Sequence, residues 1–408
     1  MKLGLIPFVS QLHDKGRIEK DHSDLFEKLK SRFSLSFVSP DNIHEADQTV
    51  AFIASGGVED DFRAMYPRLP RPLLLLADGK NNSLAASMEI LAWIKERGDS
   101  SEILHGDLNV IVSRLERLCQ IIQTRKKIAG AVIGILGAPS PWLIASYVDP
   151  IAAARRWGIT FDYIEVGDLQ KFKAEISDDQ ATDLARSFIS RARAIKEPDE
   201  SKIIEASRLY LAIKRLSEER KLDAITVRCF DFLKDGTTGC LALSLLNDDG
   251  LTAGCEGDAQ STFSMFLLRI LTGEIPFMAN PAAVECETNR ISLAHCTVAT
   301  SITREFVLRN HFESGLGVAI QGEFSPGPVT VFKCGRPGLD RFFISGGRLL
   351  SNQSDPNRCR TQVELVLDER VEYFLKNPLA NHHLMVRGNH AGLLKEFVAA
   401  AETTPNMF

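Results

Sequence analysis

The segment Cys255-Glu-Gly-Asp258 has the side chains best suited to chemistry in this 408-residue chain. It directly precedes a run whose apolar residues recur at helical spacing, so Glu256 is expected on a loop that leads into a helix N-terminus. The positive end of a helix dipole favours an ionised carboxylate, and such loops line the ligand-binding edge of open α/β sheets. The pattern also fits a plainer interpretation, in which Asp258 only caps the helix and Glu256 is an acid of its first turn.

Other candidate side chains stand next to short apolar runs. Asn280 follows the run 275–279, and His295 ends the run 291–294. Asn381-His382-His383 opens a further strand. A single histidine at a strand end more often makes a structural hydrogen bond than binds a metal. Together, however, these positions predict a site at which several strand ends converge.

Oxygen ligands completed by imidazole suit Mn²⁺, or Mg²⁺ as an alternative, better than zinc. A divalent ion would polarise a carbonyl and a neighbouring hydroxyl, which makes a C–H proton easier to remove. The eight cysteines include no C-x-x-C pair, so structural zinc is not expected. We interpret them as small buried apolar residues of a reducing compartment.

The elements that must position these residues follow an α/β pattern over the first two thirds of the chain. Buried strands are predicted at 3–9, 50–54 and 73–77, and a helix follows over 84–95. The basic cluster 125–127 precedes a fresh strand, which places a domain boundary after residue 128.

The predicted fold class is therefore α/β, with two open parallel-sheet, Rossmann-like domains and a β-rich C-terminal domain. The first α/β domain covers 1–128, and the second covers 129–285 and carries the Glu256 loop. From residue 286 to 408, short alternating runs separated by Gly, Pro, Asn and Asp predict the β-rich domain.

Composition excludes several classes of function. The formal net charge of -5 provides no cationic field for a phosphate backbone, so nucleic acid is not expected as a partner. No run of 18 apolar residues and no signal-like N-terminus is present, so we expect a cytoplasmic protein without a membrane partner.

In order and spacing, the segments 239–250, 254–258, 272–280 and 293–296 resemble the L-fucose and L-arabinose isomerase superfamily. The likeness continues through further short segments at 82–84, 137–146, 321–322, 359–361 and 381–383. The resemblance implies two α/β domains, a β-rich C-terminal domain, and homotrimers or homohexamers with active sites between subunits. It also implies an intramolecular oxidoreductase that converts a small aldose sugar to a ketose through a metal-bound enediol.

Residue by residue, the resemblance makes Glu256 the first acidic ligand and the general base. His295 matches a histidine of the arabinose branch, and His382 matches the C-terminal metal ligand, with His383 as an alternative in the double histidine. We also name candidates for substrate binding, which are His383, Arg360 and His311.

Asn280 departs from the pattern, because the family's second acidic ligand falls at this position. An amide oxygen can coordinate a metal but cannot act as a base. Another acid could compensate, and nearby candidates are Glu285, Glu287 and Asp258. The departure leaves three hypotheses: an active isomerase, a carbohydrate-binding protein or divergent enzyme on the same fold, and a decayed site.

Overall fold

The computed structural model describes residues 1–12 and 20–403. The chain divides into two compact units, of which the first contains Met1–Gln123 with the described C-terminal residues 398–403, and the second contains Thr124–Phe397. Within the described residues, no helix is both long and apolar enough to cross a membrane.

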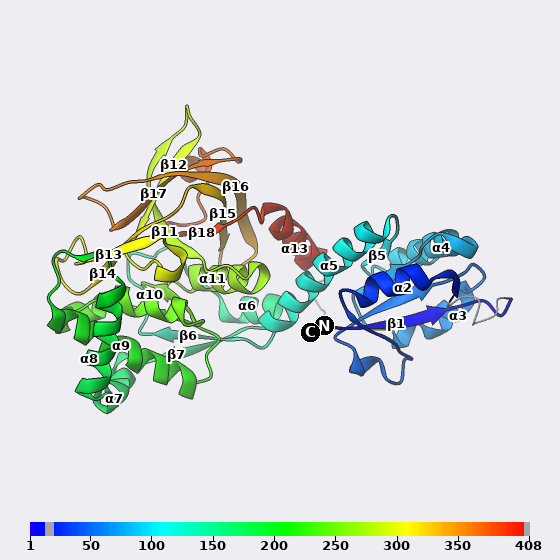
Figure 1. Ribbon diagram of the computed structural model, residues 1–408, viewed down its shortest axis with the longest axis horizontal. Helices are drawn as coiled ribbons and strands as arrows, with labels where there is room; N and C mark the ends of the chain where they lie inside the picture. Colours follow the sequence, from blue (N-terminus) through cyan, green and yellow to red (C-terminus); the bar gives the residue numbers. More distant parts are fainter. Residues whose placement is uncertain (13–19, 404–408) are drawn as a thin grey trace. The chain divides into compact units, whose positions relative to one another are not determined.

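The first unit contains a parallel five-stranded sheet of order β2-β1-β3-β4-β5 with helices on both faces (Figure 1). Apolar residues of α2 and α5 pack on one face, and those of α3 and α4 pack on the other. The strands are β1 (Lys2–Phe8), β2 (Ser34–Phe37), β3 (Gln48–Ile53), β4 (Leu73–Leu76) and β5 (Ser101–Leu104). The helices are α2 (Ser23–Lys30), α3 (Glu59–Met65), α4 (Ser83–Glu96) and α5 (Leu108–Ile128).

The second unit begins with a four-stranded parallel sheet of order β10-β9-β6-β7. Its strands are β6 (Val132–Leu136), β7 (Thr160–Ile164), β9 (Ala224–Val227) and β10 (Thr252–Cys255). The helices of this part are α6 (Pro150–Trp157), α7 (Val166–Glu175), α8 (Asp178–Arg191), α9 (Glu200–Glu219), α10 (Cys240–Asp248) and α11 (Ala259–Thr272).

A closed antiparallel barrel of order β11-β12-β17-β16-β15-β18 completes the second unit. Its strands are β11 (Phe277–Glu285), β12 (Arg290–His295), β15 (Gly327–Gly335), β16 (Arg341–Asn352), β17 (Thr361–Leu367) and β18 (His383–Arg387). A small sheet of β8 (Ala194–Ile195), β13 (Glu305–Arg309) and β14 (Ala319–Glu323) has the strand order β14-β13-β8, and its β14 contacts β17 of the barrel. The remaining helices are α12 (Tyr373–Lys376) and α13 (Ala391–Thr403).

Helix α11 joins the two halves of the second unit. It contacts β9 and β10 of the parallel sheet as well as β15 and β18 of the barrel. Eleven of its residues are buried, so the helix is enclosed nearly all round by the sheet and the barrel. The N-terminus of α11 therefore lies where sheet loops and barrel strands meet.

The predicted fold class is confirmed: parallel α/β sheets precede a β-rich region that includes a barrel. The basic cluster 125–127 lies in the last turn of α5 and not in a linker, which suits the negative end of the helix dipole. The predicted second and third domains lie within one compact unit, and the boundary at 285/286 stays a prediction.

Candidate metal centre

The backbone between β10 and α11 has an unusual conformation that fixes Glu256. Glu256 has φ 64° and Gly257 has φ 72°, both in the left-handed region. A Cβ at position 257 would lie 2.7 Å from the Ala138 carbonyl oxygen, so only glycine fits here. Asp258 then caps α11, because its Oδ1 accepts the Ser261 N–H at 2.8 Å. Left-handed backbone at a non-glycine residue often accompanies a functional site.

Glu256, His295 and His382 come together from three elements. Each offers one ligand atom, and these atoms lie within 4.8 Å of one another. His295 ends β12, and His382 directly precedes β18. All three residues are buried, with exposed fractions of 9%, 4% and 0%. One carboxylate and two imidazoles at this spacing can hold a divalent ion.

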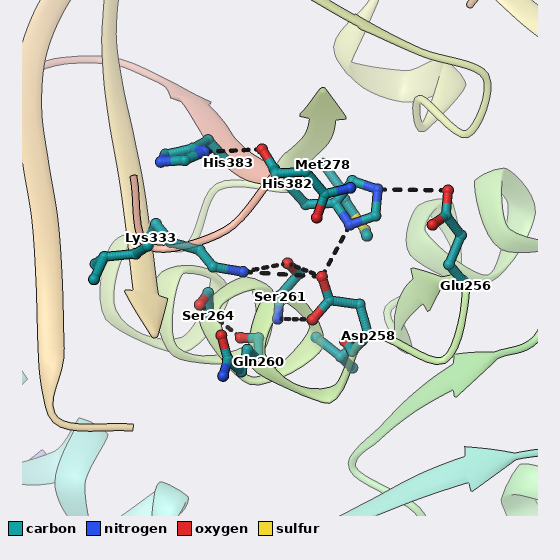
Figure 2. A network of polar contacts seen from close by, with 12 residues as sticks. Glu256, Asp258, Gln260, Ser261, Ser264, Met278, Lys333, His382 and His383 are labelled. Atoms are coloured by element: carbon teal, nitrogen blue, oxygen red, sulfur yellow. Dashed lines mark hydrogen bonds and ion pairs between the residues drawn. The ribbon is translucent and has the colours of Figure 1, made fainter. Parts of the chain in front are cut away.

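The Nε2 atom of His382 supports this fit directly. It is buried, and within the described chain it has no hydrogen-bond partner. Glu256 Oε1 lies 3.6 Å from it, which is beyond hydrogen-bond range (Figure 2). A buried nitrogen without a partner is costly unless a ligand completes its bonding.

Asp258 orients the other side of the His382 ring. His382 Nδ1 lies 2.9 Å from Asp258 Oδ2, and both side chains are fully buried (Figure 2). Burial favours the neutral acid, but Lys333 and His382 together hold the pKa of Asp258 well below its usual range. An ionised carboxylate only accepts hydrogen bonds, so Nδ1 must carry the proton. This carboxylate–histidine arrangement is the usual support of a metal-binding imidazole.

The electrostatics of the three candidate ligands differ. Burial, with a contribution from His382, lowers the pKa of His295 to about 4, so this ring is neutral and able to bind a metal. Burial by itself would lower the pKa of His382. The hydrogen bonds and negative charges of Asp258 and Glu256 outweigh this effect and raise the pKa of His382 to about 9. Burial also opposes ionisation of Glu256, yet His382 and Trp142 lower its pKa overall. A divalent cation bound by these residues would take the place of the proton on His382 Nε2.

Glu256 and His295 line a cavity of about 660 Å³. Trp142, which also lines the cavity and is half exposed, donates its Nε1–H to Glu256 Oε2 at 2.6 Å. His295 Nδ1 lies 2.9 Å from Thr297 Oγ1, which fixes the orientation of that ring. The cavity therefore combines an immobilised carboxylate with a volume that a small sugar could occupy.

Asn280 also lines the cavity, but it is not at a strand end as its sequence predicted. It lies within β11 opposite Ala294 of β12, because the bulge between Pro281 and Ala283 lets the strand continue. Its Oδ1 accepts a hydrogen bond from Asn381 Nδ2 at 3.1 Å. An amide thus stands where the superfamily's second acid was expected.

The compensating acids named from sequence lie in different places. Glu285 is the last residue of β11, where its carboxylate accepts a hydrogen bond from Thr288 Oγ1 at 2.6 Å. Neither Glu285 nor Glu287 is among the described residues that line the cavity. Asp258 contacts the centre only through His382, and Glu313 is the other carboxylate at the cavity wall.

The remaining site candidates are more dispersed. His383 faces away from the centre: its Nδ1 donates to the Asn381 carbonyl at 3.0 Å, and its Nε2 lies 3.0 Å from the Tyr373 hydroxyl. His311 lines the cavity. Arg360 lies in a separate cavity, and its guanidinium donates to Asn310. The structure thus brings His382, and not His383, to Glu256.

Two residues at this site were not proposed for it from sequence. Trp142 lies in the segment 137–146 that carries the superfamily resemblance, but the sequence alone gives this aromatic residue no role at the site. Lys333 lies in one of the short alternating runs of the predicted β-rich domain, where a buried lysine is uncommon. The sequence does not reveal the partners of these two residues, because Trp142 is distant from Glu256 along the chain and Lys333 is distant from Asp258.

Comparisons with known proteins relate this chain to sugar isomerases. Residues 146–273, which include Glu256 and Asp258, match the family of the L-arabinose isomerase central domain. A sulfoquinovose isomerase of Alkalicoccus urumqiensis is 24% identical over 330 residues, which cover 77% of this chain and 73% of that protein. One of Priestia aryabhattai is 23% identical over 267 residues, 64% of this chain and 60% of that protein.

A further sulfoquinovose isomerase, of Clostridium sp. (strain MSTE9), is 26% identical over 223 residues, which cover 51% of this chain and 48% of that protein. With the Priestia and Clostridium relatives, the match therefore spans less than two thirds of the relative's length.

Proposed function

Because the chain belongs to the L-fucose and L-arabinose isomerase superfamily, we propose that it is an aldose–ketose isomerase that works with a divalent metal. The observation that carries the proposal is the convergence of Glu256, His295 and His382 on one buried point beside a cavity. The hard oxygen donor and two imidazoles favour Mn²⁺, with Mg²⁺ as the alternative.

In this proposal, a bound metal supplies Lewis-acid polarisation of the sugar's carbonyl and adjacent hydroxyl oxygens. Glu256 moves the proton between the two neighbouring carbons, since its lowered pKa keeps it ionised near neutral pH. Trp142 holds one of its oxygens, so the carboxylate keeps one orientation. His295 stays neutral, and Asp258 fixes the ring of His382.

Sulfoquinovose is the first substrate to test, because several relatives are named for its isomerisation. Sulfoquinovose carries an anionic sulfonate, and Arg358 is the only lysine or arginine among the described residues that line the cavity. We further propose a cytoplasmic homotrimer or homohexamer, as in the superfamily pattern.

The proposal is tested by incubating metal-loaded protein with sulfoquinovose and other aldoses and measuring ketose formation. We expect turnover that chelation abolishes and that Glu256→Gln reduces by about 10²–10⁴-fold, the usual contribution of a general base. Glu285→Gln, which removes a carboxylate outside the cavity, should keep wild-type turnover. Equal activity of the two variants would contradict the role of Glu256.

Asn280 favours a second candidate function, a carbohydrate-binding protein on the same fold. Such a protein would be stabilised by its sugar, by about 2.7 kcal/mol at 100 times the dissociation constant, without converting it. Thermal stabilisation by a sugar that shows neither ketose formation nor exchange of a carbon-bound proton would favour this candidate over the isomerase.

A further inference from the structure

Lys333 is a fully buried cation next to the candidate metal centre. It lies on β15, and its side chain has an exposed fraction of 0%. Its Nζ donates to Ser261 Oγ at 2.7 Å and lies 3.9 Å from Asp258 Oδ2 (Figure 2). Burial of an ammonium group costs several kcal/mol unless a counter-charge and hydrogen bonds compensate. Lys333 is thus costly to bury, and it lies beside Asp258, the hydrogen-bond partner of the candidate ligand His382.

The ammonium group sets the direction of each hydrogen bond in the network. An ammonium group can only donate hydrogen bonds, so Ser261 Oγ accepts one from Lys333. The Ser261 hydroxyl in turn donates a hydrogen bond to Asp258 Oδ2 at 2.7 Å. Asp258 Oδ1 is occupied by the Ser261 N–H. The remaining bond of Oδ2 comes from His382 Nδ1, which must donate to an ionised acceptor.

We infer that Lys333 and Ser261 are positioning residues that hold the Asp258 carboxylate, and through it the His382 ring, with Nε2 turned toward Glu256. The inference rests on the proposed function, in which Nε2 is a metal ligand. Asp258 and Ser261 belong to the first turn of α11, whereas Lys333 comes from the barrel. The pair therefore fixes the imidazole relative to both halves of the second unit.

Two simpler accounts predict different results. If Lys333 only stabilises the packing of α11 on β15, its loss lowers the free energy of unfolding but leaves metal affinity unchanged. If it acts only through its charge, removing a positive charge near a cation site strengthens metal binding. A positioning role predicts the opposite sign, because a displaced imidazole binds the metal less well.

The decisive experiment measures Mn²⁺ affinity of the full chain by electron paramagnetic resonance for wild type, Lys333→Met and Ser261→Ala. We expect both variants to bind Mn²⁺ about 10–100-fold more weakly, the usual effect of losing outer support of a metal ligand. Ser264→Ala is the matched control, since Ser264 is also buried on α11 and bonds to the β15 backbone at Cys334. The control should retain wild-type affinity.

A second readout uses metal-free protein, so it does not depend on metal binding. We expect the His382 Nδ1 proton to give a slowly exchanging NMR signal in wild type and Ser264→Ala, and to exchange faster in Ser261→Ala and Lys333→Met. If wild type binds no Mn²⁺, the proposed function fails, and this signal alone decides the inference. If Lys333→Met does not fold, Ser261→Ala decides it. Unchanged exchange in Ser261→Ala, or unchanged or tighter Mn²⁺ binding in the folded variants, would overturn the inference.

Discussion

His382 donates its Nδ1 proton to Asp258 across 2.9 Å, although 124 positions separate the two residues in sequence. The bond joins the residue before the last barrel strand, β18, to the N-cap residue of α11. It leaves Nε2 of the same ring without a partner in the described structure, 3.6 Å from Glu256. One histidine is thereby prepared as a ligand by a carboxylate that does not itself reach the cavity.

The first prediction concerns Asp258→Asn, which keeps the shape of the side chain but removes its charge. Lys333 then becomes a buried cation without a counter-charge, so the free energy of unfolding should fall by about 3–5 kcal/mol in urea titrations. Glu369→Gln removes one partner of the exposed Lys395–Glu369 pair and should cost less than about 1 kcal/mol. Equal losses in the two variants would show that the buried charge is not compensated by Asp258.

The second prediction concerns the pH dependence of Trp142→Phe. The Trp142 N–H stabilises ionised Glu256 and helps to lower its pKa, so removing this donor should raise that pKa. If ionised Glu256 is the base, activity is lost as pH falls through its pKa. The acid limb of kcat/KM should therefore move to higher pH in the variant.

Phe230→Leu is the control for that shift, because Phe230 packs edge-on against Trp142 and has no polar group that could hydrogen-bond to the carboxylate. It should alter KM but leave the acid limb in place. If the acid limb of kcat/KM stays at the same pH in Trp142→Phe, then ionisation of Glu256 does not control the loss of activity at low pH.

The third prediction is that Asn280→Asp strengthens metal binding. The substitution adds a negative charge at the cavity while Asn381 can still donate to the same oxygen. A pair of unit charges 4 Å apart is worth about 4 kcal/mol at an effective dielectric constant of 20, so at least about tenfold tighter Mn²⁺ binding is expected in calorimetry. Asn357→Asp adds the same charge elsewhere on the cavity wall and should have a smaller effect. Weaker or equal binding in Asn280→Asp would place Asn280 outside the ligand set.

Much of the fold could be predicted because its signals are local. The buried strands at 3–9, 50–54 and 73–77 correspond to β1, β3 and β4, and the helix over 84–95 lies within α4. Apolar runs and capping residues suffice for such elements. Strand β8 is only two residues long, which is too short for an alternating pattern in its sequence. It lies between helices and forms by pairing with β13, more than a hundred residues later.

The site could be predicted where a polar or ionisable residue directly precedes a helix or ends a strand, because the ends of apolar runs are visible in the sequence. Glu256 before α11 and His295 at the end of β12 fall into this class, and the structure brings both to His382. Asn280 was expected at a strand end and lies inside β11, because a bulge that depends on β12 lets the strand pass a proline. The choice between His382 and His383 also depended on tertiary contacts, since their rings face opposite sides of the same backbone.

The central claim, a metal-dependent isomerase with Glu256 as its base, is tested most directly by solvent exchange. Sulfoquinovose is incubated in D₂O with Mn²⁺-loaded protein, and deuterium at the carbon next to the carbonyl is followed by NMR. We predict incorporation that stops on chelation and in Glu256→Gln but continues in Glu285→Gln. Sugar binding without exchange in the Mn²⁺-loaded wild type, or exchange that persists in Glu256→Gln, would contradict the claim.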